Sequence, residues 1–328
     1  MALRFSIVTP SYRQAAFLER TIQSVLTQSY PAAEYFVIDG GSDDGSREIL
    51  EAHSRELSGW VSEKDRGQAD AINKGFARAG GDIYGWINSD DFYLPGAFER
   101  VARVFSERPD VDFVYGDALS VDRDGALVNV MRFAPYEWAD LASFRIISQP
   151  AVFFRRSLWE KSGGLDLTFH YLLDHHLWLR MTPDAGIVYL PEPLAAARFY
   201  SEAKNRANTA DFGKEARRIV GWLLSDERFR TMSEPIVKKI RGGAAWLDAN
   251  YLSVGGMNGA ALRAYAKAFT LAPKRVIDDW RRVLLTGLGL VSPSAAARIF
   301  ERQSAKRLEG LRERLRSEER RVGKECRS

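Results

Sequence analysis

Three polar residues, Ser89, Asp90 and Asp91, follow the apolar segment 82–87. The apolar residues of this segment predict a buried strand that ends in a polar turn. Two adjacent carboxylates are costly to hold together unless a cation neutralises them. Hard divalent cations such as Mg²⁺ and Mn²⁺ take oxygen ligands and bridge to substrate phosphates. The triplet therefore indicates either a metal-dependent site for a phosphorylated, nucleotide-linked substrate, or an Asx turn in which Asp90 or Asp91 caps a helix starting near Pro95.

The strand and helix pattern of the first ninety residues places this triplet among other polar residues. Strands and helices alternate, which predicts βαβ units, an α/β fold and a mainly parallel sheet. In such sheets ligands bind beyond the carboxyl ends of the strands. Thr9, Pro10, Asp39, Asp65 and Asp90 all stand at or just after expected strand ends. The strands are expected at 4–10, 35–39, 60–62 and 82–87, and the helices at 17–28, 46–54 and 67–79.

The rest of the chain divides into a mixed part and a helical part. Strands are expected at 111–115, 127–133, 149–154 and 187–190, with helices at 157–161 and 171–181. From about residue 205 only helices are expected, at 212–224, 233–252, 258–271 and 276–288. The last two thirds of this region contain a spacing typical of one tetratricopeptide-like hairpin, formed by Trp246, Ala249, Ala261, Tyr265, Ala268 and Pro273. One unit is too short for a solenoid, so the hairpin either binds a protein partner or covers the catalytic domain.

The composition is that of an ordinary globular chain. The 328 residues are 45% hydrophobic and 27% charged, and no apolar run approaches the ~20 residues of a membrane span. The first ten residues are expected to form a strand rather than a signal peptide, so a cytoplasmic location is expected.

The C-terminal segment 316–328, RSEERRVGKECRS, resembles the in-frame translation of a DNA-sequencing adaptor. If it is one, it is excluded from fold reasoning, and the natural C-terminus is expected to be missing. It holds Cys326, the only cysteine, so thiol chemistry is not expected elsewhere. Without its five basic and three acidic residues, the net charge falls from +4 to +2, which removes most of the support for nucleic-acid binding.

Two long segments resemble glycosyltransferase family 2. They read SIVTPSYRQAAFLERTIQSVLTQSYPAAEYFVIDGGSDDGS and EKDRGQADAINKGFARAGGDIYGWINSDD, and the likeness covers roughly residues 4–200. The resemblance implies a GT-A fold, which is Rossmann-like with a mainly parallel sheet and helices on both faces, followed by a C-terminal α-helical extension. It implies an inverting transfer of a sugar from a nucleotide-diphosphate donor to an acceptor hydroxyl. The expected division is 1–204 for the catalytic domain, 205–315 for the extension and 316–328 for the tail.

By this resemblance, nine residues bind the nucleotide sugar: Thr9, Pro10, Tyr12, Asp39, Asp65, Arg66, Gln68, Asn88 and Ser89. Three of them have a second interpretation. Tyr12 stacks on the base or packs at the start of the first helix. Asp39 accepts from a base N–H or stabilises its own turn. Arg66 pairs with phosphate or is a solvated loop arginine.

The metal motif departs from the common form of the family. Relatives often carry Asp-Ser-Asp-Asp, whereas Asn88 opens the motif here and brings no charge. The resemblance places Mn²⁺ or Mg²⁺ on Asp90, with Asp91 as a second ligand or as support for the turn. Many relatives also have a histidine shortly after the last strand, where this chain has Tyr200.

The general base is expected in the segment GGLDLTFHYLLDHHLWLRM, which resembles the acceptor side of the family. The matching residue is Asp174, because inverting displacement needs a carboxylate that takes the acceptor proton. Asp174 is also suited to cap the helix that follows, and Asp166 is the second choice as base. His175 and His176 point in different directions on a helix, so they are not expected to bind one metal ion; one is expected to be packed and one exposed.

The predicted enzyme works on a cell-surface polysaccharide or lipid-linked glycan, in the cytoplasm or peripherally at the inner face of the membrane. Its partners are the nucleotide-diphosphate sugar, a glycan or lipid-linked acceptor and, by the C-terminal helices, a protein. Two alternatives remain open. A sugar nucleotidyltransferase would need a Gly-rich basic loop after the first strand, which TPSYRQAAF does not supply. A non-catalytic scaffold would keep the fold and use the helical hairpin to bind partners.

Overall fold

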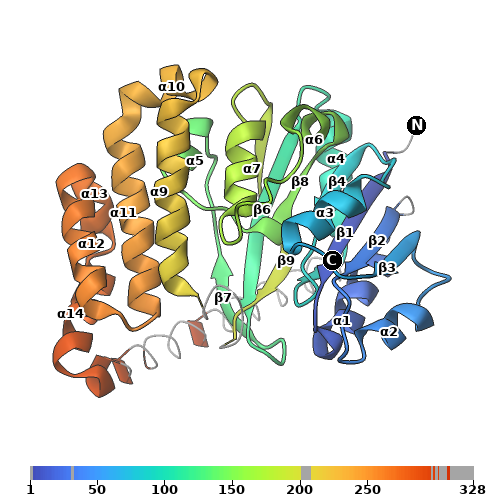
Figure 1. Cartoon of the computed structure of the whole chain (residues 1–328), viewed down its shortest axis with the longest axis horizontal. Helices are drawn as coiled ribbons and strands as arrows, with labels where there is room; N and C mark the ends of the chain where they lie inside the picture. Colours follow the sequence, from blue (N-terminus) through green and yellow to red (C-terminus); the bar gives the residue numbers. More distant parts are fainter. Residues whose placement is uncertain are drawn as a thin grey trace, which may run out of the picture.

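The computed structural model describes residues 3–30, 33–200 and 208–296, together with 298–299, 302 and 309–310. The tail 316–328 lies outside the described residues. A twisted sheet runs through the molecule, and a group of long helices stands beside it (Figure 1).

The sheet has nine strands in the order β3-β2-β1-β4-β8-β6-β9-β5, with β7 paired to β6. The strands β3, β2, β1 and β4 are mutually parallel, as the βαβ pattern predicts. Beyond β4 the sheet is mixed, because β8 runs antiparallel to both of its neighbours while β6 and β9 are parallel. The bounds are Phe5–Ser11 (β1), Ala33–Asp39 (β2), Gly59–Ser62 (β3), Ile83–Trp86 (β4), Phe92–Tyr93 (β5), Phe113–Val121 (β6), Leu127–Met131 (β7), Val152–Arg155 (β8) and Ile187–Arg198 (β9).

Helices cover both faces of this sheet. In the catalytic part they are Ala15–Leu26 (α1), Ser46–Ala52 (α2), Gln68–Phe76 (α3), Ala97–Glu107 (α4), Trp138–Ala142 (α5), Arg156–Ser162 (α6) and Leu173–Met181 (α7), with a 3₁₀ turn at Gln149–Ala151 (η1). Strand alternation separates two cores. Phe5 and Ile7 of β1 pack with α1 and α4, whereas Val8 of the same strand packs with α3.

A third group of helices follows residue 208. Its members are Thr209–Ser225 (α9), Glu227–Ser233 (α10), the 3₁₀ turn Glu234–Ile236 (η2), Val237–Val254 (α11), Asn258–Leu271 (α12), Pro273–Asp278 (α13) and Trp280–Val291 (α14). α11 packs between α9 and α12. The hairpin expected from the tetratricopeptide-like spacing is the α11–α12 pair, in which Ala249, Ala261, Tyr265 and Ala268 are buried together.

The helical extension is docked firmly on the catalytic part. The guanidinium of Arg275 donates to the carbonyl oxygens of Ser143 and Phe144, which follow α5. Gly243 of α11 allows this contact, because a Cβ there would lie 1.9 Å from the Ser143 carbonyl oxygen. The apolar cluster beneath α7 also continues into α9 and α11. Of the two roles considered for the hairpin, covering the catalytic domain is the one these contacts support.

Five elements differ from the sequence prediction. The predicted strand 149–154 begins as a 3₁₀ turn, and only its second half joins the sheet as β8. The last strand continues to Arg198 instead of ending at residue 190. Pro191 and Pro193 interrupt its apolar pattern, but a register shift against Gly116 and Asp117 accommodates them. The short elements β5, α5 and α10 were not predicted, because each is too short to show a period.

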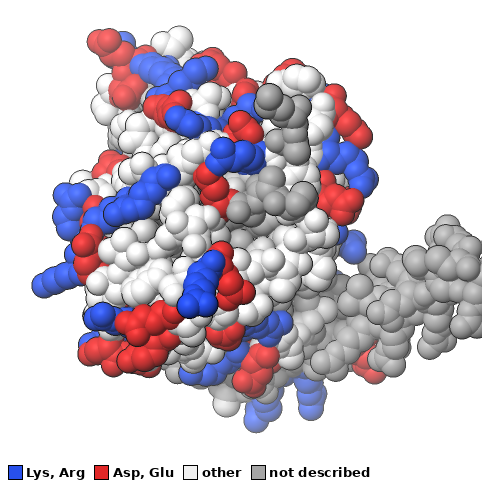
Figure 2. All heavy atoms as spheres, turned by 90° about the vertical axis from the view of Figure 1, so that its right-hand side faces the viewer, with Lys and Arg blue, Asp and Glu red and all other residues white. Residues whose placement is uncertain are grey.

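No helix within the described residues is long and apolar enough to span a bilayer. On the face shown in Figure 2, basic and acidic side chains are interspersed over the surface. Interspersed charge of this kind does not form the single-sign stripe that characterises nucleic-acid-binding surfaces.

Candidate active site

A cavity of about 1030 Å³ lies at the carboxyl ends of the parallel strands, where ligands of such sheets bind. Its volume is at the upper end of the range of small-molecule sites, so it can hold more than one substrate group. Its lining includes the ends of β1 and β4, the loop that leads into α3, the segment 146–150, the end of β9, the start of α7 with the residues before it, and the helices α9 and α11. Of the predicted site residues, the lining includes Pro10, Tyr12, Asp65, Gln68, Asn88, Ser89, Asp90, Asp91 and Asp174.

One wall of the cavity is formed by Tyr12, Gly40 and Asp65, which come from three different strand ends. A Cβ on Gly40 would lie 3.2 Å from the Tyr12 ring and 3.1 Å from an Asp65 oxygen, so only glycine lets them approach. The side chain of Tyr12 is 57% exposed and does not pack into the start of α1. The packed role at the start of the first helix is therefore not observed, and stacking on the base stays a prediction.

Thr9 and Asp39 are buried behind this wall and do not line the cavity. The Asp39 carboxylate accepts from the backbone N–H groups of Gly41 and Ser42 and from the hydroxyl groups of Ser42 and Ser62. This is the turn-stabilising role that the sequence offered as an alternative to base recognition. The hydroxyl of Thr9 is paired with that of Tyr35 at 2.9 Å, beneath the cavity.

Where the loop after β3 leads into α3, Gln68 lines the cavity and Arg66 does not. Arg66 is not part of the lining; its exposed guanidinium forms an ion pair with the buried Asp70, 2.8 Å away. Gln68 lines the cavity and donates to the Asn88 amide oxygen at 2.7 Å. The amide nitrogen of Asn88 in turn lies 3.3 Å from an Asp91 oxygen. Asn88 thus connects α3 to the acidic turn.

The acidic turn itself is tied to the chain on both sides. Asp91 accepts from the backbone N–H of Arg198 at 2.8 Å, and the Arg198 guanidinium donates to the Asp90 carbonyl oxygen. The Tyr200 hydroxyl donates to Asp90 Oδ2 at 3.0 Å. From α1, the Thr21 hydroxyl contacts the carbonyl oxygens of Ser89 and Asp91. The turn is consequently fixed in place by α1 and by the end of β9.

Burial dominates the electrostatics of the two carboxyl groups. It raises the pKa of Asp90, and it raises the pKa of Asp91 far more, with the negative charge of Asp90 as the second cause. The helix after the turn, α4, has Gly96 as its N-cap, so the alternative in which Asp90 or Asp91 caps that helix is wrong. The chain turns again at Leu94 and Pro95 before α4 begins, which leaves both carboxylates at the cavity.

Asp174 also lines the cavity, from the first turn of α7. The helix has Leu172 as its N-cap, so the expectation that Asp174 caps it is wrong. Asp174 Oδ1 accepts from the N–H of His175, its own neighbour, at 2.7 Å. Because α7 starts two residues earlier than the cap interpretation requires, the carboxylate projects from the side of the first turn rather than closing its end.

The extension holds the segment that leads into α7. The carboxylate of Glu215, from α9, is 5% exposed and accepts from three successive N–H groups. His170, Tyr171 and Leu172 donate to it at 2.7–2.8 Å. Hydrogen bonds to a charged acceptor are among the stronger contacts in proteins, so α9 fixes the residues just before Asp174.

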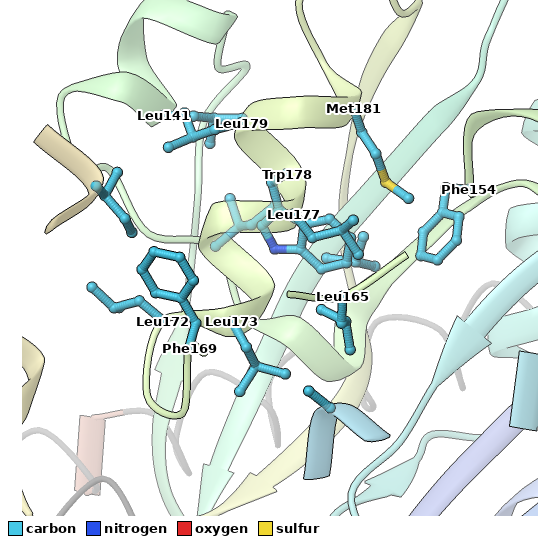
Figure 3. Close-up of a cluster of buried hydrophobic side chains, with 14 of the residues drawn as sticks. Leu141, Phe154, Leu165, Phe169, Leu172, Leu173, Leu177, Trp178, Leu179 and Met181 are labelled. Carbon is cyan, nitrogen blue, oxygen red and sulfur yellow. The ribbon is translucent and has the colours of Figure 1, made fainter. Parts of the chain in front are cut away.

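Most side chains of α7 are buried, and those of Leu173, Leu177, Trp178, Leu179 and Met181 lie in the hydrophobic cluster shown in Figure 3. His175 is 1% exposed and His176 is 4% exposed, so the expectation of one packed and one exposed histidine is wrong. His175 packs on Phe144, and His176 packs between Phe169 and Trp222 of α9. The expectation failed because the extension covers the face of α7 that would otherwise meet water.

Asp166, the second choice as base, does not face the cavity. It lines a separate hollow with His176, Arg180 and Arg218, and its carboxylate accepts from the N–H and hydroxyl of Thr168. Among the described residues, no group of three or more His, Cys, Asp or Glu side chains is arranged to hold a metal ion.

From the sequence, Gln149 and Pro150 either shape the acceptor pocket or start a strand; both line the cavity, and Gln149 donates to the Trp86 carbonyl oxygen at 2.7 Å. The sequence analysis missed Phe212 and Tyr251, which line the cavity from α9 and α11. One signal was available for Glu215: it lies on the apolar stripe that Phe212, Ala216, Ile219 and Leu223 form along α9. A charged residue on a buried stripe points to a specific partner.

Comparisons with known proteins agree with this architecture. The model of the family described as Glycosyl transferase family 2 matches residues 6–160. An uncharacterized glycosyltransferase of Mycobacterium tuberculosis is 34% identical over 178 residues, which cover 53% of this chain and 67% of the relative. The chain therefore belongs to glycosyltransferase family 2.

Two solved structures show the same fold. TarS of S. aureus, as its segment 1–349 in complex with UDP-GlcNAc, has a TM-score of 0.60 at 16% identity, with 88% of each chain covered. This chain spans half the length of a longer TarS structure. A mannosyltransferase from Pyrobaculum calidifontis, in complex with GDP-Man and Mn²⁺, has a TM-score of 0.58 at 21% identity, with 90% of this chain and 86% of that chain covered. The fold is thus of the GT-A type, with a C-terminal helical extension.

Proposed function

We propose that the chain is an inverting glycosyltransferase that binds a nucleotide-diphosphate sugar between Tyr12 and Asp90 and uses Asp174 as general base. The observation that carries the proposal is that one cavity is lined by both Asp90 and Asp174. An inverting transfer needs a carboxylate for the acceptor proton and a group that stabilises the leaving diphosphate within reach of the same sugar, and the shared cavity supports this arrangement.

On the donor wall, each lining residue has a role that fits a nucleotide sugar. The exposed ring of Tyr12 offers a stacking surface for the base. Asp65, Gln68, Asn88 and Ser89 offer polar groups along the cavity toward the acidic turn. Thr9, Pro10 and Asp39 shape this wall, the buried Thr9 and Asp39 acting through the backbone that they hold. Arg66 is close in sequence but paired with Asp70, so it would need to turn to reach a phosphate.

The acidic turn fits a divalent cation, Mn²⁺ or Mg²⁺. The chain supplies the half-buried Asp90 and the buried Asp91; burial raises the pKa of both carboxyl groups, and the charge of Asp90 adds to the shift at Asp91. Asp91 already accepts from Arg198 and Asn88, so Asp90 is the proposed ligand and Asp91 the support. Mg²⁺-type sites commonly use one or two carboxylates with substrate phosphates and water. When bound, the ion would stabilise the negative charge that develops on the leaving diphosphate.

On the acceptor wall, Asp174 takes the proton. The acceptor oxygen forms a bond to the anomeric carbon, the bond from that carbon to the diphosphate oxygen breaks, and the acceptor proton passes to the Asp174 carboxylate. The configuration at the anomeric carbon inverts because a single displacement occurs. Glu215 holds the backbone before Asp174 through three N–H groups, so the carboxylate stays aligned with the donor.

The test is the variant Asp174→Asn, which keeps the shape and one oxygen but removes the basicity. General-base assistance is worth about 10²–10⁴-fold in rate, so the transfer rate should fall by that amount while the Kd of the donor stays unchanged. The donor is first found by a thermal-shift screen of nucleotide sugars with Mn²⁺, since a bound donor stabilises the folded state. If the variant keeps the wild-type kcat, Asp174 is not the base. If no donor binds, the non-catalytic scaffold is the better description.

The wider setting follows from the family. We infer that the acceptor is a glycan or lipid-linked glycan of the cell surface, and that the enzyme acts in the cytoplasm or at the inner face of the membrane. We also infer a catalytic domain at 1–204 and an extension at 205–315. Fractionation of cells expressing the tagged chain, with and without high salt, tests the location.

A further inference from the structure

The cavity has an aromatic part that the proposed donor contacts leave unused. Three aromatic side chains line this part: Tyr171 from the segment before α7, Phe212 from α9 and Tyr251 from α11. The Phe212 and Tyr251 rings are stacked, with centroids 3.8 Å apart and an interplanar angle of 8°. Tyr171 continues the row, with its ring 5.2 Å from that of Phe212. Two of the three rings are supplied by the helical extension.

The rings differ in exposure in a way that matches a binding surface. Phe212 is buried, whereas Tyr171 and Tyr251 are half-buried and border the cavity. Phe212 therefore supports two rings that keep part of their surface toward the cavity. Apolar surface held open beside a catalytic carboxylate is covered favourably by a ligand with an apolar face. The C–H groups on one side of a pyranose ring form such a face.

The charges around the rings select for a neutral ligand. Among the described residues that line the cavity, the lysine and arginine side chains are Lys64 and Arg198. Lys64 follows the donor-side strand β3, and Arg198 is engaged with the acidic turn. Around the rings stand the carboxylates of Asp174, Asp211 and Glu215, and the charge of Asp211 contributes after burial to the raised pKa of Tyr171. Lys214 also acts on Tyr171, but it forms an ion pair with Asp211 at 2.7 Å. The excess of carboxylates around the rings disfavours an anionic sugar or a phosphate.

Tyr251 is also close to the proposed base. Its hydroxyl is buried, and the charge of Asp174 raises its pKa in addition to the burial. A sugar resting on the Tyr251 ring would thus carry its hydroxyl groups toward Asp174. Glu215 accepts from the Tyr171 backbone N–H and so holds the first of the three rings in place.

We propose that α9 and α11 complete the acceptor subsite, in which the rings of Tyr171 and Tyr251, supported by Phe212, bind one neutral pyranose unit with a hydroxyl facing Asp174. The proposal rests on the proposed function for the role of Asp174 but not for the binding of the sugar. It makes the extension a substrate-binding element and not only a cover or a partner-docking hairpin.

The test uses the full chain and four neutral probes, the methyl glycosides of glucose, galactose, mannose and N-acetylglucosamine. Saturation-transfer NMR measures their binding, with methyl glucuronide as the charged counterpart. We expect saturation transfer to ring C–H protons for at least one neutral probe and none for the glucuronide. Tyr251→Leu should weaken binding of that probe about tenfold, and Tyr251→Phe should keep it, since stacking on an aromatic ring contributes on the order of 1 kcal/mol.

Controls separate this subsite from a folding defect and from the donor site. Trp280→Leu removes a 52% exposed ring from α14, outside the cavity, and should change nothing. Tyr171→Leu is a second variant in case Tyr251→Leu melts at a much lower temperature. Once the donor is known, its Kd should be the same in all variants, while the acceptor KM rises.

Two outcomes would overturn the proposal: no neutral probe binds the wild-type chain, or a folded Tyr251→Leu and a folded Tyr171→Leu both bind it as the wild type does. Preference for the glucuronide would overturn the neutral class. If neutral probes bind through these rings but no nucleotide sugar is turned over, the proposed function fails and the subsite stands.

Discussion

The two walls of the cavity are constructed in different ways. The donor wall uses short segments that follow consecutive strands, from Pro10 to Asp91, and each segment is placed by the strand before it. The acceptor wall joins Gln149, Tyr171, Asp174, Phe212 and Tyr251, which come from a 3₁₀ turn, a loop and three helices. The first wall depends on local chain geometry, and the second depends on packing between distant parts of the chain. The donor wall should therefore tolerate changes in the extension, and the acceptor wall should not.

The largest effect is expected on the donor wall. Asp90→Ala removes the proposed cation ligand, so transfer should fall by at least about a thousandfold, because such an ion supplies several kcal/mol of charge stabilisation. The variant should melt no lower than the wild type, since the charge of Asp90 raises the pKa of the buried Asp91 and opposes its ionisation.

Steady-state kinetics with Mn²⁺ and a thermal melt without it measure both effects of this change. Asp124→Ala, in the exposed turn between β6 and β7, is the matched control. A variant that transfers at a near-normal rate in EDTA-treated buffer would show that the donor wall works without a metal ion.

A smaller effect, confined to the acceptor wall, is expected from Glu215→Gln. The amide nitrogen would face N–H groups that the carboxylate now satisfies, which costs about 1–3 kcal/mol of unfolding free energy for each unsatisfied group. The kcat should fall about tenfold because Asp174 loses its alignment, while the donor Kd stays constant.

Chemical denaturation, kcat and donor Kd, measured on one preparation, distinguish the two walls. Glu227→Gln, an exposed carboxylate on the neighbouring α10, is the control. A loss of stability with unchanged kcat would reduce Glu215 to a purely structural contact, and a weakened donor Kd would contradict the independence of the donor wall.

The smallest effect is a difference in acid stability. Burial is the first cause that lowers the pKa of His175 and His176 to about 3, so both are neutral in the folded state at pH 6. The unfolded chain takes up their protons below about pH 6.5. Stability present above that pH is therefore lost as the pH falls, by about 1.4 kcal/mol per pH unit for each histidine.

For His53, the change of stability with pH has the opposite sign. Burial opposes the charge of His53, but hydrogen bonds to Glu19 and Glu56 offset it and raise its pKa. His53 therefore stabilises the fold at low pH and loses this contribution as the pH rises through its folded pKa. Thermal melts from pH 5 to 8 should show a shallower loss on acidification for His176→Phe and a steeper one for His53→Gln. Parallel curves for all three proteins would contradict the assignment.

The contrast between the walls also explains what the sequence could predict. The strand ends 9–12, 39–41, 65–68 and 88–91 were located correctly because each lies directly after an apolar strand, and the chain direction places it at one edge of the sheet. Asp174 was placed on the cavity only through the family resemblance. Phe212 and Tyr251 were missed, since an apolar stripe on a helix looks the same whether it meets a core or a cavity.

The errors have a common origin. The exposure of His176 and the cap at Asp174 were misjudged because α7 was considered as an isolated helix. In the structure α9 covers one side of it, and Glu215 binds the backbone of the segment that leads into it. Asp166 was misjudged for a similar reason, because a bend at Thr168 and Phe169 turns it away from the cavity.

The apolar cluster beneath α7 continues without interruption into Phe212, Ile219, Ile240 and Leu247 of the extension. During synthesis the sheet and α7 leave the ribosome before α9 and α11 exist, and chains emerge at about 5–20 residues per second. For several seconds the catalytic part would then expose the surface that α9 and α11 later cover. The nascent chain is a natural client for a chaperone during this interval, and a gene cut before α9 should give an insoluble product.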